Sequence, residues 1–279
     1  MIDRKLFENV IEDMKNIDKP YFKTGFTDLD DLLGLRKKGA LVVIGARPAM
    51  GKTAFLLNIL ERVANQGKKC VLFSFEMSKE QVAQRLLCQV SETDLVKVRM
   101  GKMTNKDWDK FSESIEKIIN WDFSISDIND DTIDKIEERI KTIKPEVVFI
   151  DYIQLIHVSK RLDRYTAIEN IMKELKRIAK ENEIIIFVNS QLSRGVENRC
   201  EKRPLLSDLR DSGSIENISD VVIFIYRDEY YHFIEEDSFL DGNAEIIVAK
   251  NKFGPTGVIN LHFKKQITKF ANIIRETEF

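Results

Sequence analysis

Short apolar runs alternate with amphipathic stretches along most of the 279-residue chain. Four largely apolar runs are short enough to be buried strands. They cover residues 40–45, 69–75, 147–151 and 184–189. Between them, apolar residues recur at helical spacing, and helices are predicted at about 54–60, 78–90, 105–119, 131–143 and 165–181. Apolar strands separated by helices are typical of a parallel sheet that helices cover on both faces.

The last third of the chain has a different pattern. Strands are predicted over Asp220–Tyr226, Ala244–Ala249 and Val258–Phe263, with few helices between them. Strands joined without crossover helices favour antiparallel or mixed pairing at one edge of the sheet. The predicted fold class is therefore α/β, with a mostly parallel central sheet flanked by helices and antiparallel C-terminal edge strands.

Residues 3–16 have the pattern of one amphipathic helix. Ile2, Leu6, Val10 and Met14 recur at a spacing of four, with polar residues elsewhere. The segment 17–20, which ends in Pro20, separates this helix from the rest. Its apolar face can pack on its own domain or dock on a neighbouring subunit. We therefore divide the chain into a linker helix, 1–19, and a main domain, 20–279.

Composition narrows the possible classes of protein. The formal net charge is -2 and the pI is about 6.1, which argues against a strongly basic nucleic-acid binder but permits a local basic lining. Cys70, Cys88 and Cys200 lack zinc or redox spacing, so we expect reduced thiols and a cytoplasmic location. We expect no membrane span and no signal peptide, because neither pattern occurs.

The segment from Ala46 to Thr53 carries the clearest chemical signal. It lies between a predicted strand and a predicted helix and ends in Gly51-Lys52-Thr53, as a phosphate-binding P-loop does. The predicted nucleotide-binding residues are Ala46, Arg47, Pro48, Ala49, Met50, Gly51, Lys52, Thr53 and Ala54. Lys52 is expected to reach the β- and γ-phosphates of ATP, and the Thr53 hydroxyl to ligate Mg²⁺. The usual first glycine is replaced by Ala46, and the simpler alternative is a glycine-containing turn.

Polar residues follow three other predicted strands. Ligands bind beyond the carboxyl ends of parallel strands, so these residues are expected near the P-loop. Asp151 is a candidate Mg²⁺ ligand, Glu76 a candidate base for the attacking water, and Gln191 a candidate sensor of the γ-phosphate. The alternatives are a helix cap or a solvated loop group.

Together these segments resemble the ordered motifs of DnaB-type replicative helicases. The resemblance covers about residues 20–265. It rests on the P-loop and on segments 25–34, 73–77, 150–155, 189–194 and 206–216. It implies a RecA-like P-loop NTPase that forms a hexamer, hydrolyses ATP with Mg²⁺ and moves 5′ to 3′ along single-stranded DNA. It also implies that Glu76 is the catalytic base.

The same resemblance assigns further residues and partners. Arg210, Asp211 and Gly213 would lie in the DNA-binding loop of the central channel, and residues 3–16 would be the linker helix that docks on the adjacent subunit. A helicase loader or a primase would be a partner. The family's N-terminal collar domain has no counterpart in this sequence, which is either a fragment or a naturally short relative.

One feature bears on the strength of the predicted activity. The family places a Lys-x-Arg pair after a late strand, and its arginine reaches the neighbour's nucleotide. Here the pair is Lys250 and Lys252, and lysine lacks the bidentate fork of arginine. The alternatives are a recombinase or regulatory ATPase of the RecA superfamily and, because of Lys252, a helicase-derived module that binds nucleotide with little turnover.

A basic run that includes Arg194 follows the predicted Gln191 strand. Its other members are Arg199, Lys202 and Arg203. We expect this run to contact the phosphates of DNA in a channel, with a solvated loop as the alternative.

Overall fold

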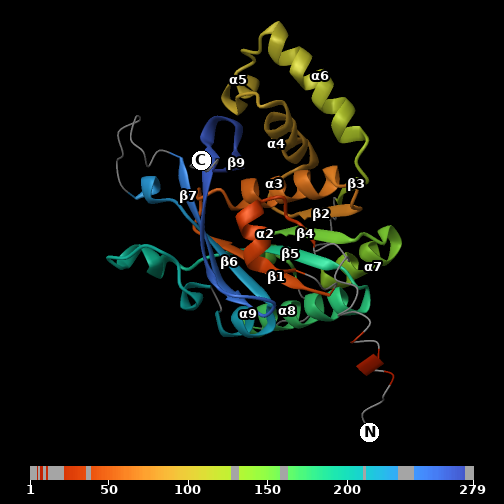
Figure 1. Ribbon diagram of the computed structural model, residues 1–279, viewed down its shortest axis with the longest axis vertical. Helices are drawn as coiled ribbons and strands as arrows, with labels where there is room; N and C mark the ends of the chain where they lie inside the picture. Colours follow the sequence, from red (N-terminus) through yellow and green to blue (C-terminus); the bar gives the residue numbers. More distant parts are fainter. Residues whose placement is uncertain are drawn as a thin grey trace.

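The structure is a computed structural model. It describes residues 22–35, 39–126, 132–157, 163–209, 212–231 and 242–273, together with residues 5, 7, 8 and 11. Nine strands of the described chain form one sheet in the order β3-β2-β4-β5-β1-β6-β7-β8-β9 (Figure 1). The strands are β1 (Leu41–Ala46), β2 (Cys70–Ser74), β3 (Phe123–Ser126), β4 (Val147–Asp151), β5 (Ile185–Gln191), β6 (Val221–Tyr226), β7 (Asn243–Asn251), β8 (Gly257–Lys264) and β9 (Lys269–Asn272).

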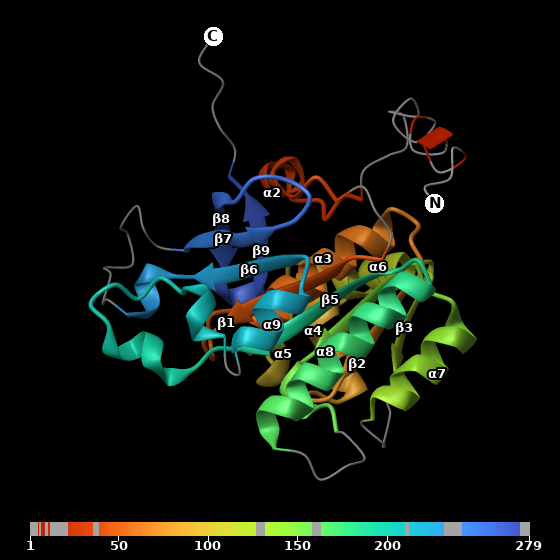
Figure 2. The same ribbon diagram turned by 90° about the horizontal axis from the view of Figure 1, so that it is seen from below.

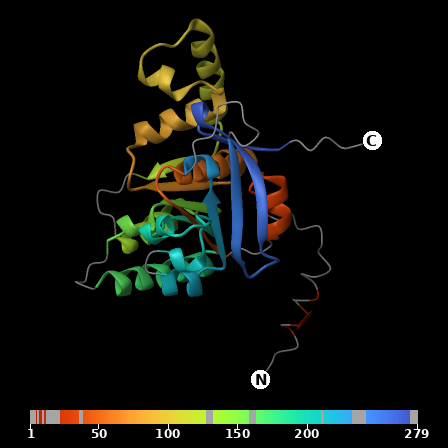
Figure 3. The ribbon, with the colours of Figure 1, turned by 90° about the vertical axis from the view of Figure 1, so that its left-hand side faces the viewer.

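The sheet changes from parallel to antiparallel at β6. The pairs from β3 to β6 are parallel, and β6 with β7, β7 with β8 and β8 with β9 are antiparallel. Figure 3 shows β6, β7 and β8 side by side at this edge. The predicted fold class is therefore confirmed, including the antiparallel strands at its C-terminal edge.

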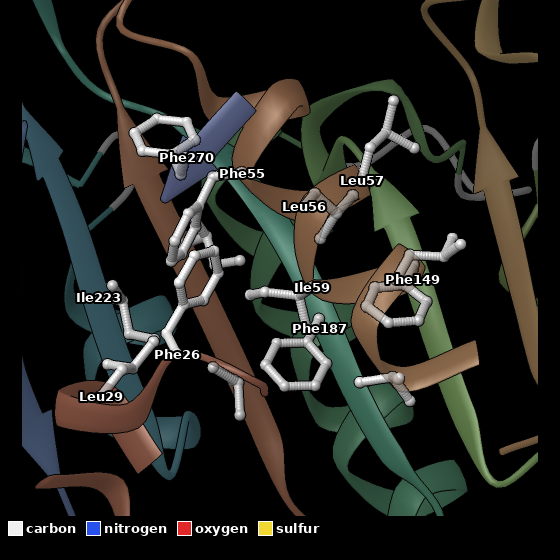
Figure 4. Close-up of a cluster of buried hydrophobic side chains, with 14 of the residues drawn as sticks. Phe26, Leu29, Phe55, Leu56, Leu57, Ile59, Phe149, Phe187, Ile223 and Phe270 are labelled. Carbon is white, nitrogen blue, oxygen red and sulfur yellow. The ribbon is translucent and has the colours of Figure 1, made fainter. Parts of the chain in front are cut away.

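Helices cover both faces of the sheet, as the apolar strands require (Figure 2). The helices are α2 (Thr27–Leu33), α3 (Lys52–Asn65), α4 (Lys79–Ser91), α5 (Leu95–Arg99), α6 (Asn105–Ile119), α7 (Ile133–Ile143), α8 (Arg164–Glu181) and α9 (Ser212–Ile218). α2 and α3 pack on one face and α7, α8 and α9 on the other, in two separate apolar clusters. On the first face, Phe149 of β4 and Phe187 of β5 stack with their ring centres 5.5 Å apart, close to α3 (Figure 4).

Helices α4, α5 and α6 project beyond the sheet at the top of Figures 1 and 3. Side chains fix where α4 and α6 begin, because Ser78 and Thr104 each form a capping box with the residue three positions later. Phe111 of α6 is buried with Cys88 and Leu95 in a small third cluster. Much of α6 therefore lies outside the main core.

Several elements differ from those that the sequence predicts. The four-residue strands β3 and β9 and the short helices α2, α5 and α9 were not predicted. Most of the predicted linker helix, 3–16, lies outside the described residues, although positions 5, 7, 8 and 11 are helical. No helix among the described residues is long and apolar enough to cross a membrane.

Candidate nucleotide site

The loop between β1 and α3 has the backbone shape of an anion site. Ala49 and Gly51 adopt left-handed conformations, with φ of 65° and 96°. A Cβ on Gly51 would also lie 3.1 Å from the Phe270 ring, so both conformation and packing favour glycine here. Among the described residues, no side chain caps the start of α3. Its first N–H groups can therefore donate to a phosphate.

Packing explains why glycine stands at position 45 and alanine at 46. A Cβ on Gly45 would come within 2.8 Å of the Phe224 ring of β6. Ala46 itself is completely buried at the end of β1. The glycine thus serves the contact between strands, and the left-handed turn of the loop is made by Ala49 and Gly51.

Thr53 and Asp151, both predicted to hold Mg²⁺, lie in direct contact. The Thr53 Oγ1 donates a hydrogen bond of 2.7 Å to Asp151 Oδ2. The described residues contain no group of three His, Cys, Asp or Glu that could hold a metal. Mg²⁺ commonly needs only one or two carboxylates together with substrate phosphates and water, so the pair fits this ion.

Lys52 lies at the same edge of the sheet. Burial lowers the pKa of its ammonium group, and the carboxylates of Asp151 and Glu76 oppose that shift. The ammonium nitrogen lies 4.7 Å from the centre of the Tyr152 ring. Lys52, Asp151 and Glu76, three of the predicted site residues, therefore lie close enough to interact.

Glu76 and Gln191 lie on opposite sides of Asp151. Glu76 is exposed in the bend after β2, whose last residue, Ser74, pairs with Asp151. Gln191 is the last residue of β5 and pairs with Ala46. Its backbone N–H donates to Gln154 Oε1 over 3.2 Å. Gln154, which sequence reasoning missed, therefore ties the chain that follows Asp151 to Gln191.

The Arg47 side chain does not join the phosphate cradle. Its guanidinium forms an ion pair with Glu197, at 2.6 Å, and donates to the carbonyl oxygen of Leu192. Arg47 and Leu192 line a cavity of about 250 Å³ with Gln191, Ser193 and Arg194. Arg47 thus connects the P-loop to the segment that follows β5.

Two arginines that belong to none of the sequence motifs, Arg85 and Arg227, also lie near the site. Burial and the nearby Arg99 lower the pKa of Arg85, on α4, whereas Asp151 and Glu76 raise it. Its buried Nε has no hydrogen-bond partner among the described residues. Arg227, after β6, donates to the Ala49 carbonyl over 3.3 Å. Neither residue has a local sequence signal, because their positions depend on how distant elements pack.

The P-loop follows the carboxyl end of β1, whereas Lys250 and Lys252 lie near its amino end, on the opposite side of the sheet along the strand direction. Lys250 donates to the carbonyls of Glu216 and Asn217 near the end of α9, and Lys252 pairs with Asp220 at 3.3 Å. Asp220 also accepts from the N–H of Leu41, the first residue of β1. A six-residue strand spans about 20 Å, so these lysines are remote from their own P-loop.

The predicted DNA-binding residues are only partly described. Arg210 and Asp211 lie outside the described residues. Gly213 is in the first turn of α9, where a Cβ would lie 3.3 Å from the Tyr165 hydroxyl. Arg194 is exposed, and its side chain forms no hydrogen bond or ion pair with the described residues.

The rest of the basic run is bound within the chain. Arg199 pairs with Asp208, Arg203 pairs with Glu245, and Lys202 donates to the Glu197 carbonyl. The sequence predicts that this run contacts the phosphates of DNA, with a solvated loop as the alternative. In the fold, acids pair with two of its arginines, Arg199 and Arg203.

Comparison with known proteins identifies a consistent group of relatives. Residues 22–272 match the family model described as the DnaB-like helicase C terminal domain. The replicative DNA helicase DnaC of Bacillus subtilis is 39% identical over 259 residues, which are 90% of this chain and 56% of that protein. A probable replicative DNA helicase of Trieres chinensis is 40% identical over 96% of this chain and 62% of its own length. This chain therefore spans little more than half of these relatives.

Solved structures agree with the sequence comparison. One that is described as an ATPase domain superposes with a TM-score of 0.90 at 34% identity, covering 97% of this chain and 98% of that one. A structure described as a DnaB-like replicative helicase and its interactions with primase has a TM-score of 0.89 at 33% identity. It covers 98% of this chain and 67% of that one.

Proposed function

The chain belongs to the DnaB-like helicase C-terminal domain family, and on that basis we propose that it is the ATP-hydrolysing motor of a hexameric replicative DNA helicase. The motor moves 5′ to 3′ along single-stranded DNA and unwinds the duplex. The observation that carries the proposal is the 2.7 Å hydrogen bond between Thr53 and Asp151. Thr53 and Lys52 lie in the first turn of α3, whose start has no side-chain cap among the described residues. The named relatives are replicative helicases, which does not favour a recombinase or a regulatory ATPase.

Different side chains have different roles in ATP hydrolysis. The P-loop N–H groups and Lys52 bind the phosphates. Thr53 and Asp151 would hold Mg²⁺, which would neutralise charge on the phosphates. Glu76 accepts a proton from the attacking water, and its exposed position in the bend after β2 leaves room for that water. Gln191 orients the γ-phosphate and the water, and Gln154 fixes its backbone.

A neighbouring subunit completes the site. Lys250 and Lys252 lie about one strand length from their own P-loop, so they can reach only the nucleotide of another copy. When residues at one end of the sheet serve a site at the other end, neighbouring copies must meet head to tail, and such an interface gives a ring where the rotation between copies closes. This arrangement supports the hexamer and the assignment of Lys252 as the residue that acts in trans.

An exposed apolar surface supports the assembly. Trp108, Ile115 and Ile119 lie on one stripe of α6 and are exposed, as are Val96 of α5 and Met100, the residue after α5. Phe7 and Ile11, one helical turn apart, are also exposed. The linker helix, 1–19, of one subunit covers the α5–α6 surface of the next, and residues 20–279 form the motor.

The whole protein acts with further partners. Arg194, Arg210, Asp211 and Gly213 contact the DNA backbone. One related structure is described by its interactions with primase, which supports primase as a partner here, together with a helicase loader. The protein itself acts in the cytoplasm.

Mixing two inactive variants tests the proposal directly. Parental protein should hydrolyse ATP faster with single-stranded DNA and should unwind a forked duplex, whereas Lys252→Ala and Glu76→Gln should each be nearly inactive. Mixed rings of the two should regain ATPase, because about a quarter of the interfaces join an intact Glu76 to an intact Lys252. Demonstrated mixed rings without rescue would contradict completion in trans.

A further inference from the structure

Asn189 is a completely buried polar residue at the P-loop end of a mostly apolar face of the sheet. Side chains alternate between the two faces of a strand, so Asn189 shares a face of β5 with Ile185 and Phe187. On β4, the residue two positions after Phe149 on the same face is Asp151. The stacked rings of Phe149 and Phe187 (Figure 4) are thus followed, toward the P-loop edge, by Asp151 and Asn189.

Hydrogen bonding sets the orientation of the Asn189 amide. Its Nδ2 donates to Asp151 Oδ1 over 2.8 Å, while Thr53 donates to the other carboxylate oxygen. A carboxylate oxygen accepts, so the NH₂ group faces Asp151 and the carbonyl oxygen points elsewhere. Asn189 is completely buried, yet its Oδ1 accepts no hydrogen bond from the described residues.

A second buried asparagine shows how a purely structural amide is satisfied. Asn58, in the middle of α3, is also completely buried. Its Nδ2 donates to the Ala54 carbonyl over 2.8 Å, and its Oδ1 accepts from the Phe270 N–H over 2.6 Å. Both ends of Asn58 are therefore occupied, whereas one end of Asn189 is left for another donor.

We propose that Asn189 is a positioning residue of the magnesium site. Its Nδ2 holds the Asp151 carboxylate, and its buried, unpartnered Oδ1 would be an acceptor for a donor that comes with Mg²⁺ and nucleotide. Mg²⁺ usually keeps several waters in proteins, and such waters need acceptors. The inference rests on the proposed function, because it adds one residue to that nucleotide site.

Nucleotide binding with and without Mg²⁺ tests the role of Asn189. We would measure binding of a fluorescent ADP to the full chain in EDTA and over a Mg²⁺ titration. Asn189→Leu keeps a similar volume and removes both polar groups, and Asn189→Ala removes them without any clash. Both should raise the Mg²⁺ midpoint about tenfold or more, because partners of metal ligands typically contribute that much. Affinity in EDTA should stay within about twofold of the parent.

A matched control separates this role from a structural one. Asn58→Leu should lower the thermal stability without moving the Mg²⁺ midpoint. A parental midpoint in folded Asn189 variants would overturn the inference, as would an equal loss of affinity in EDTA and in Mg²⁺. If the parent itself binds no nucleotide in Mg²⁺, the proposed function fails instead.

Discussion

The two ends of strand β1 are surrounded by charge in opposite ways. At its carboxyl end, Lys52, Asp151, Glu76 and Arg85 gather around the P-loop, and buried polar atoms of Arg85 and Asn189 lack partners among the described residues. At its amino end, the buried Asp220 accepts from Lys176, Lys252 and the Leu41 N–H. At the first end, buried polar atoms remain available to a ligand. At the second end, Asp220 is paired with groups of the chain itself.

This difference indicates what each end can do. An unpaired buried polar group is costly, and a ligand that supplies the missing partner removes that cost. The amino end holds Lys252 on Asp220, and the lysine must leave that carboxylate to reach a neighbour's nucleotide. Lys252 can do so because its side chain is 45% exposed, and Lys176 at 18% remains to pair with Asp220.

The largest effects are expected from changes at the carboxyl end. Glu76→Gln keeps the size of the side chain and removes the base, so ATP turnover should fall about 10²-fold or more while nucleotide still binds. Lys52→Ala should weaken binding and turnover together, because it removes a phosphate-binding charge. Steady-state ATPase and fluorescent nucleotide binding measure both. Parental turnover in Glu76→Gln would show that Glu76 is not the base.

At the amino end of β1, substitution of Asp220 or Lys252 is expected to lower the free energy of unfolding. Asp220→Ala leaves the poorly exposed Lys176 ammonium and the Leu41 N–H without their acceptor, and should lower the free energy of unfolding by about 3 kcal/mol. Lys252→Ala removes a half-exposed partner and should cost less than about 1 kcal/mol. Urea unfolding of the two variants measures the difference. Equal losses would mean that Lys252 accounts for the whole contribution of Asp220, and that Lys176 and the Leu41 N–H add nothing to it.

The α5–α6 surface offers a smaller effect that concerns assembly. Trp108→Ser should weaken the oligomer several-fold in dissociation constant, because a large exposed side chain would no longer be buried on the neighbour's linker helix. Val258→Ser, an exposed apolar residue on β8, is the matched control and should leave assembly unchanged. Sedimentation over a range of protein concentrations compares them. Identical curves for both variants would remove the α5–α6 surface from the interface.

The sequence predicted the parts of the site that local patterns encode. The P-loop has its own spacing, and Asp151 and Gln191 follow apolar strands whose ends share one edge. Asn189, Gln154 and Arg85 could not be predicted, because their roles depend on which strand or helix lies beside them. Strand β3 was missed since its four residues, Phe123–Ser126, lack a continuous apolar run and three are only partly buried.

The smallest predicted effect distinguishes free arginines from paired ones in the segment after β5. Arg194 is exposed without a partner among the described residues, whereas Arg203 is held by Glu245. If Arg194 contacts a DNA phosphate, Arg194→Ala should reduce the salt dependence of single-stranded DNA binding by about one counterion.

Arg203→Ala is the control for that effect. It removes the same charge and should leave the slope unchanged, because Glu245 already neutralises that guanidinium in the folded chain. Arg210→Ala should behave like Arg194→Ala if position 210 lies in the channel. Fluorescence anisotropy at several salt concentrations measures each slope. A change of slope for Arg203→Ala alone would reverse the assignment, because the ion pair with Glu245 would then have to open when DNA binds.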